Sequence, residues 1–406
     1  METTLIPLTQ ERVHEILSTH FNYYQKLNSE EQEVFVKRVW DFIGIKDFVP
    51  KENVELAAGI DNIKTLISAA AIQLTFGLSK YELEHFSRIF IYPSAYYNNM
   101  TKHWHKGEAN VVGALVFSWK DLEAGYADTT DKLNLGLHEM AHALMLSINV
   151  GEGNDPFFAQ YFYKWWGISS EEFQKLEKHE ASFFRDYGGT NPQEFFSVCV
   201  ECFFEAPVEF KDKHPEIYRQ TCILLNQDPS GNYATITEAR EKLLSEKQVD
   251  VIPSVLQYAT SGRTWTFTMY FVTAWAVFFI AAGLMGAIQA LIVAGASVFL
   301  VAFIAWYALS HKEFSVYDNA FVVSYERFGR KAQGEIILSP ESIISIAFVY
   351  DRDSTEESIL QVMHVEGTQI RKDTWAFTHL KSADRAGLRK AMREFCAKNR
   401  ITITGQ

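Results

Sequence analysis

The spacing of apolar residues divides the chain into helical and extended regions. Apolar positions recur every three or four residues in three N-terminal runs, which predicts amphipathic helices at 31–42, 60–76 and 131–149. Short apolar runs bounded by turn residues are typical of strands, and two of these lie at 89–93 and 113–119. Beyond residue 312 six further strand-like runs precede a helical pattern at 382–398. We therefore expect an α+β chain, with a mainly helical N-terminal domain containing a small sheet and a C-terminal β-rich domain closed by one helix.

One stretch departs from this pattern because residues 264–310 contain no Asp, Glu, Lys or Arg. A single helix of that length would be roughly 70 Å long, more than twice the ~30 Å hydrocarbon core of a bilayer. We therefore expect a transmembrane helical hairpin at 263–311 with the lipid bilayer as a partner. The expected order is then a domain at 1–230, a connector at 231–262, the hairpin, and a β domain at 312–406.

The charges beside this hairpin predict its orientation. Arg263 and Lys312 flank it and its turn is uncharged, so the positive-inside bias places both flanks in the cytoplasm. The N-terminus shows no basic segment followed by an apolar one, as a cleaved export signal would. We expect a multi-pass protein of the inner (cytoplasmic) membrane of a bacterium, with both soluble domains cytoplasmic.

The net charge and the cysteine content argue against some classes of protein. The net charge of −12 gives no basic footprint and argues against a nucleic-acid-binding protein. Four scattered cysteines form no disulfide framework, which suits a reducing compartment. Cys199 and Cys202 have C-x-x-C spacing, but they lie in the middle of a predicted helix, and a redox pair needs a helix N-terminus. We interpret them as packed thiols.

The helix predicted at 131–149 carries the run His138-Glu139-Met140-Ala141-His142. Residues four apart lie on one face of a helix, so both imidazoles can reach one metal ion. Glu139 would then lie beside a water in the open metal position, as the general base of a zinc peptidase does. Asp131 or Thr130 would cap the helix start. The alternative is a core helix that contains two partly buried histidines.

A second segment, at 187–207, supplies carboxylates for the same site. Asn191 as N-cap, Pro192 and Glu194 mark a helix start. Glu201 lies among phenylalanines and valines, where a carboxylate is costly to bury unless it pairs with a cation. Zinc is the obvious cation, so we expect His138, His142 and Glu201 to bind it. Glu194 has a structural role available as the capping-box acid, with an indirect contact to the metal site as the alternative.

With these residues the chain resembles the Mlc titration factor A family of zinc-dependent peptidases over roughly residues 15–230. The resemblance rests on the runs at 134–142, 113–121 and 187–207. It implies zinc ligation by His138, His142 and Glu201, with Glu139 as general base. It also implies a fourth ligand from the loop before the strand, where His105 matches best and His103 competes. Tyr187 either stabilises an oxyanion or packs before the helix.

We therefore expect a membrane-anchored zinc metallopeptidase that hydrolyses peptide or protein substrates. The strand at 113–119 is either a sheet edge that an extended substrate can join or an ordinary strand. A non-catalytic adaptor that binds a regulatory protein is the alternative function, and the intact Glu139 favours the enzyme. The C-terminal β domain is similar at fold level to small pleckstrin-homology-like domains found beside bacterial membrane hairpins.

Overall fold

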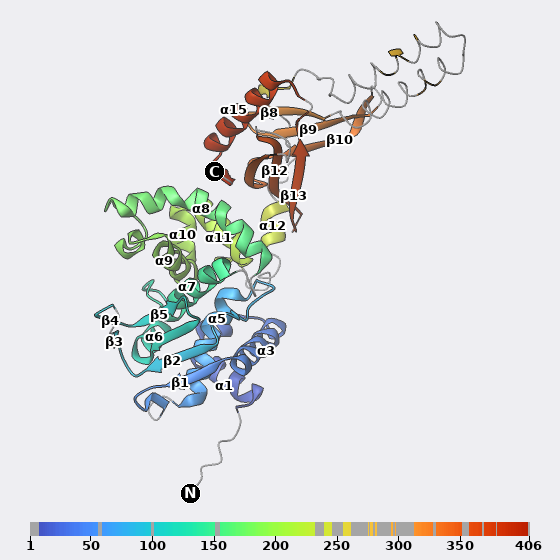
Figure 1. Cartoon of the computed structure of the whole chain (residues 1–406). Coiled ribbons are helices and arrows are strands. Elements are labelled where there is room, and N and C mark those ends of the chain that lie inside the picture. Colours follow the sequence, from blue (N-terminus) through green and yellow to red (C-terminus); the bar gives the residue numbers. More distant parts are fainter. Residues whose placement is uncertain are drawn as a thin grey trace. The chain divides into compact units, whose positions relative to one another are not determined.

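The computed structural model describes most of the chain in two compact units, Met1–Glu246 and Lys247–Gln406 (Figure 1). The described residues are 8–55, 59–98, 101–150, 155–231, 239–245, 255–260, 312–327, 330–350, 357–367, 369–378 and 380–404, with six single positions between 275 and 297. The side chains of 149, 150, 325–327 and 330–334 are not described.

The first unit is mainly helical. Its helices are α1 (Gln10–His20), α2 (Asn22–Gln25), α3 (Ser29–Ile45), α5 (Ile60–Thr75), α6 (Trp119–Ala127), α7 (Leu135–Val150), α8 (Pro156–Glu177), α9 (Pro192–Glu205), α10 (Pro207–Lys213), α11 (Pro215–Leu225) and α12 (Ala239–Ser245), with the 3₁₀ turn η1 (Asp186–Gly189). The helices predicted from residues 31, 60 and 131 correspond to α3, α5 and α7. The prediction is wrong only at the start of α7, where Asn134, rather than Asp131 or Thr130, accepts a hydrogen bond from the backbone N–H of Leu137 at 3.0 Å.

A four-stranded sheet lies beside α7. Its order is β1 (Asp47–Pro50), β2 (Arg88–Tyr92), β6 (Ala114–Ser118) and β5 (Gly107–Asn110). The first three strands run parallel, and β5 runs antiparallel to β6 at the sheet edge. The strand predicted at 113–119 is therefore an internal strand, and the edge comes from the segment expected to be a polar loop. A two-stranded ribbon, β3 (Tyr96–Asn98) and β4 (His103–His105), precedes β5.

Helix α7 lies between α9 and β5 (Figure 1). Four of its central residues, Leu137, Met140, Ala141 and Ala143, are fully buried. α9 buries nearly every side chain from Phe195 to Phe204. The hydroxyl of Ser197 donates to the carbonyl of His138 at 3.1 Å, which links the two helices directly. This packing fixes the face of α7 that carries the histidines against the face of α9 that carries the glutamates.

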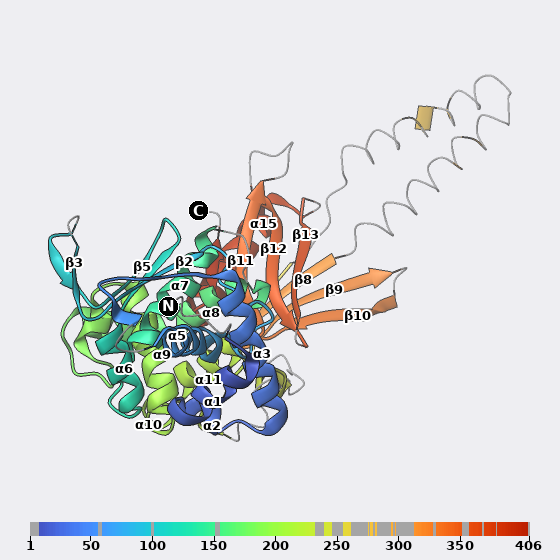
Figure 2. The ribbon, with the colours of Figure 1, turned by 90° about the horizontal axis from the view of Figure 1, so that it is seen from below.

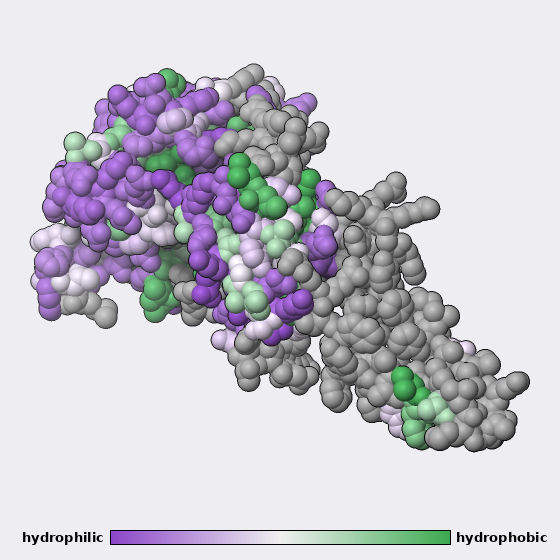
Figure 3. Space-filling model, turned by 90° about the horizontal axis from the view of Figure 1, so that it is seen from above, coloured by the Kyte–Doolittle hydropathy of each residue, from purple (hydrophilic) through white to green (hydrophobic). Residues whose placement is uncertain are grey.

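The described part of the second unit is β-rich and includes the predicted C-terminal helix, α15 (Ser382–Lys398). Two sheets, built mainly from antiparallel strand pairs, are visible in Figure 2. They contain β7 (Leu256–Ala259), β8 (Lys312–Tyr317), β9 (Phe321–Arg327) and β10 (Arg330–Leu338), and β11 (Ile343–Tyr350), β12 (Glu357–Glu366), β13 (Gln369–Ala376) and β14 (Thr402–Thr404). The apolar face of α15, with Leu388, Met392 and Phe395, joins their core. On the face shown in Figure 3, most of the described surface is hydrophilic, with smaller apolar areas between. The likeness to a pleckstrin-homology domain stays a prediction.

The predicted location in a bacterial inner membrane is wrong on the evidence of the described helices. None of the helices in the described part of the chain is long and apolar enough to cross a membrane, whereas a multi-pass protein needs spans of roughly 20 apolar residues each. The predicted hairpin at 263–311 itself falls outside the described residues, apart from the six single positions between 275 and 297.

The turn between β5 and β6 offers a test of how the edge strand is held. Gly113 has φ +86°, and a Cβ there would lie 2.4 Å from the carbonyl oxygen of His85. Gly113→Ala should lower the free energy of unfolding by about 1–3 kcal/mol, measured by urea unfolding of the full chain. The control is Gly44→Ala, because nothing lies within 4 Å of that Cβ; it should be neutral or stabilise by about 0.5–1 kcal/mol. Equal effects of the two changes would contradict the assigned strain.

Candidate metal centre

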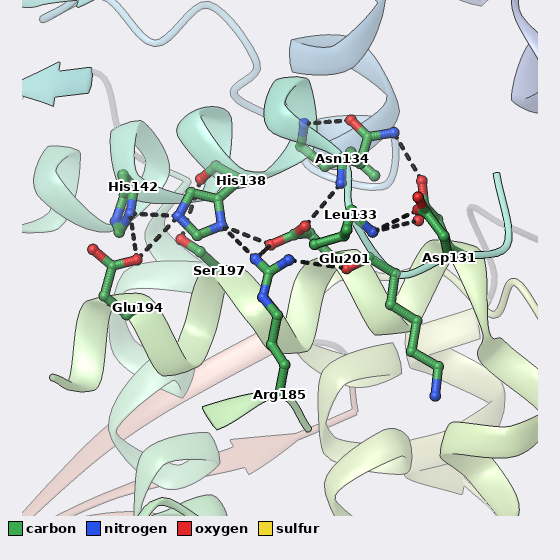
Figure 4. A network of polar contacts seen from close by, with 12 residues as sticks. Asp131, Leu133, Asn134, His138, His142, Arg185, Glu194, Ser197 and Glu201 are labelled. Atoms are coloured by element: carbon green, nitrogen blue, oxygen red, sulfur yellow. Dashed lines mark hydrogen bonds and ion pairs between the residues drawn. The ribbon is translucent and has the colours of Figure 1, made fainter. Parts of the chain in front are cut away.

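Three side chains from two helices converge on one point. His138 and His142 project from α7 and Glu194 projects from the first turn of α9 (Figure 4). The two histidine Nε2 atoms are 3.1 Å apart, and Glu194 Oε2 lies 3.0 Å from Nε2 of His138 and 3.2 Å from Nε2 of His142. Three atoms with lone pairs can approach this closely only if protons or a cation lie between them. The cluster therefore has the composition and spacing of a metal site.

Glu201 lies on the other side of the His138 ring (Figure 4). Its Oε1 accepts from Nδ1 of His138 at 2.6 Å and from the guanidinium of Arg185. Its Oε2 accepts from the backbone N–H of Asn134 at 2.8 Å. The side chain is 1% exposed, so the expected buried pairing with a cation does occur. The cation that the structure shows there is the guanidinium of Arg185.

The geometry therefore favours Glu194 over Glu201 as the third ligand. The predicted helix start is confirmed, because the side chain of Asn191 accepts from the N–H groups of Gln193 and Glu194. The carboxylate of Glu194, however, points to the two histidines rather than serving as the capping-box acid. Glu194 and Glu201 are two turns apart on one face of α9, so helical spacing alone does not separate them. The position of Arg185, which comes from a different segment, distinguishes them.

Burial and charge act in opposite directions on this cluster. Burial by itself would lower the pKa of His138, but its hydrogen bonds with Glu194 and Glu201 outweigh burial and raise the pKa to about 10. Burial likewise opposes ionisation of Glu194, yet the hydrogen bonds from His138 and His142 hold its pKa well below the usual range. The two glutamates therefore favour a positive charge at His138, and a divalent cation would replace protons in the cluster.

Glu139 lies one step along α7 and is 6% exposed. Burial is the main reason that its pKa is raised. Edge strand β5 passes directly over it, because a Cβ on Gly107 would lie 2.5 Å from Oε1 of Glu139. The sequence reading missed Gly107. The available signal is a glycine at the start of a short strand, because such a glycine can mark a place where another group approaches the backbone closely. The sequence alone does not say that this group is Glu139.

The remaining predicted residues surround the centre at different distances. The ring of Tyr187, on η1, lies 5.9 Å from that of His138, and burial raises its pKa to about 12. His105, on β4, is not in the cluster: its Nε2 lies 2.6 Å from Oγ1 of Thr101, and its ring stacks on Tyr96. His103 is exposed on the same strand. The structure therefore brings Tyr187 next to the histidines and holds the two loop histidines apart from them.

The thiols of the C-x-x-C segment take no part in this centre. Cys199 and Cys202 are free and buried, which confirms their interpretation as packed thiols. Burial raises the pKa of Cys202 to about 12, so its thiolate is not available as a ligand or nucleophile at neutral pH.

A cavity of about 420 Å³ opens beside His138 and Glu139. Its walls come from β4, β5, α6, the segment before α7, and η1. Glu201 and Arg185 lie at the cavity, whereas His142 and Glu194 are not among its lining residues. The metal cluster therefore has an open space on one side that is large enough for part of a ligand.

Comparison with known proteins agrees with this centre. Residues 6–223 match the sequence model of the glucose-regulated metallo-peptidase M90 family. Mlc titration factor A of Yersinia enterocolitica is 26% identical over 229 residues, which cover 50% of this chain and 81% of that protein. The protein of the same name from Cronobacter sakazakii is 26% identical over 228 residues, covering 50% and 82% respectively. Because the family match covers more than half of the chain, the protein belongs to the M90 family of metallopeptidases, with His138, His142 and Glu194 as its candidate metal site.

Proposed function

We propose that this metallopeptidase hydrolyses peptide bonds with a zinc ion held by His138, His142 and Glu194 and with Glu139 as general base. The observation that carries the proposal is the convergence of three ligand atoms, all within 4.8 Å of one another, beside the buried carboxylate of Glu139. A non-catalytic adaptor has no need for this additional carboxylate, so the enzyme is favoured.

The ligand set fits zinc by its chemistry. Two imidazole nitrogens and one carboxylate oxygen are the ligands of many catalytic zinc sites, and they leave one position open. Magnesium and calcium prefer sites made of oxygen atoms alone. When bound, zinc would supply Lewis-acid polarisation of the scissile carbonyl and of water.

The protein groups supply proton transfer and orientation. Glu139 accepts a proton from the attacking water and delivers it to the leaving amine. Glu201 accepts from Nδ1 of His138, which turns Nε2 of that ring towards Glu194. Arg185 holds Glu201 in place through an ion pair. The hydroxyl of Tyr187 hydrogen-bonds with Glu194 and would donate to the developing oxyanion once it leaves that carboxylate.

Edge strand β5 supports binding of an extended substrate. It is the outer strand of its sheet, antiparallel to β6, and its first residue, Gly107, lies against Glu139. A peptide that pairs with a sheet edge has its main chain fixed by hydrogen bonds. Pairing along β5 would therefore place a peptide bond near the base, a role that the sequence reading gave to the neighbouring strand.

The role of the base is tested by Glu139→Gln. The amide cannot accept a proton from water, so peptide hydrolysis should fall by about 10²–10⁴-fold. Zinc content after dialysis should stay at the wild-type level, since Glu139 is not in the ligand set. Peptide cleavage and metal analysis on the same preparation give both values. Near-normal turnover in a zinc-loaded variant would exclude the role.

The choice of third ligand is tested by Glu194→Gln and Glu201→Gln in parallel. Loss of Glu194 should abolish zinc retention on dialysis. Loss of Glu201 should leave zinc bound with affinity about 10–100-fold weaker, and it should lower stability because Arg185 loses its buried partner. Metal titration and urea unfolding measure the two effects. If zinc retention follows the reverse order, Glu201 is the ligand.

The contact between β5 and the base is tested by Gly107→Ala. The new methyl group would displace Glu139, and a displacement of about 1 Å can reduce the rate roughly 10²-fold. Zinc content should not change. Gly44→Ala, which meets no neighbour, serves as the control and should keep full activity. An unchanged rate in Gly107→Ala would show that β5 does not constrain the base.

A further inference from the structure

The cavity beside His138 has an apolar rim on a mostly polar protein. Trp104, Leu133 and Tyr187 line it and are 71%, 53% and 52% exposed. They come from three separate segments, β4, the loop before α7, and η1. Large apolar side chains that gather in an exposed position around a cavity are typical of a binding site.

The exposure of Leu133 is imposed by the backbone around it. Its N–H donates to Asp131 at 2.9 Å and to Glu205 at 3.1 Å. The next residue, Asn134, is fixed by Glu201 and also donates its side-chain amide to Glu205 at 3.0 Å. The main chain is therefore tied to α9, and the side chain of Leu133 is left at the cavity. The helix predicted at 131–149 included this leucine, whereas α7 begins two residues later, at Leu135.

The two basic groups of the cavity wall already have acidic partners. Lys106 pairs with Asp121 at 2.7 Å, and Arg185 pairs with Glu201. A charged substrate side chain would lose its hydration in the cavity and would have to compete with these existing ion pairs for a partner. Its burial there would therefore be costly in free energy. An apolar side chain would instead cover the three rim residues, and the removal of its apolar surface from water would favour binding.

We propose that this cavity is the specificity subsite for a large apolar side chain, such as Phe or Leu, next to the scissile bond. The inference rests on the proposed peptidase function, because the cavity shares His138 and Glu139 with the centre. Its volume of about 420 Å³ is in the range of small-molecule sites. Leu133 and Trp104 are then the residues that set the preference.

The test uses the full-length, zinc-loaded protein and peptides of identical sequence that carry Phe or Ala at each position around the cleaved bond. At one of these positions, wild-type protein should prefer Phe by about tenfold or more in kcat/KM, as expected for burial of one large apolar side chain. Leu133→Ser and Trp104→Ala should each lower that ratio several-fold. The control Val208→Ser changes a residue that is 71% exposed on α10, away from the cavity, and should leave the ratio unchanged.

Binding provides a second measurement that does not need turnover. Fluorescently labelled Phe and Ala peptides are titrated by anisotropy against zinc-loaded Glu139→Gln, with and without Leu133→Ser. If the Phe peptide binds more tightly than the Ala peptide, and Leu133→Ser reduces this difference, the subsite is supported. This holds even if no peptide is cleaved, and in that case only the hydrolytic function is wrong. Cleavage without a preference for Phe, or with a preference that both rim variants leave intact, overturns the subsite and leaves the peptidase function standing. If peptides are neither cleaved nor bound with preference, both proposals are wrong.

Discussion

The centre depends on the placement of His138 between two carboxylates of one helix. Glu194 faces Nε2 and Glu201 faces Nδ1, so the ring has its orientation fixed from both sides. Burying two carboxylates on one helix face is costly unless each has a cationic partner. Arg185 is the partner of Glu201. Glu194 has the two histidines, and a metal ion would be a stronger partner than their protons.

The sheet and the loops beside α7 leave one side of this cluster open to a cavity. Strand β5 lies against the proposed base through Gly107, and the loop before α7 is tied to α9 by Glu205. The same ties that hold the loop leave Leu133 exposed at the cavity. The rigidity of the centre and the exposure of Leu133 at the proposed subsite therefore have one structural cause, the packing of the start of α7 against α9.

Much of the fold followed from local patterns. The helices α3, α5 and α7, the N-cap of α9 by Asn191, and the strands and final helix of the second unit agree with the apolar spacing. These features depend on neighbours within a few residues, so a single sequence specifies them. The bounds of α7 and the identity of the edge strand were missed, because both depend on contacts with segments far away in the chain. The membrane location was inferred from a long uncharged run and the charges that flank it, and the described helices contradict it.

At the site, the sequence by itself determined the pair His138 and His142 with Glu139 between them, because residues four apart must share a helix face. It also determined that the second segment supplies a buried carboxylate. Only the tertiary structure decided which carboxylate faces both histidines, because Glu194 and Glu201 lie on the same face of α9 and differ in what packs beside them. That difference is the guanidinium of Arg185, which the fold brings to Glu201 from outside the helix.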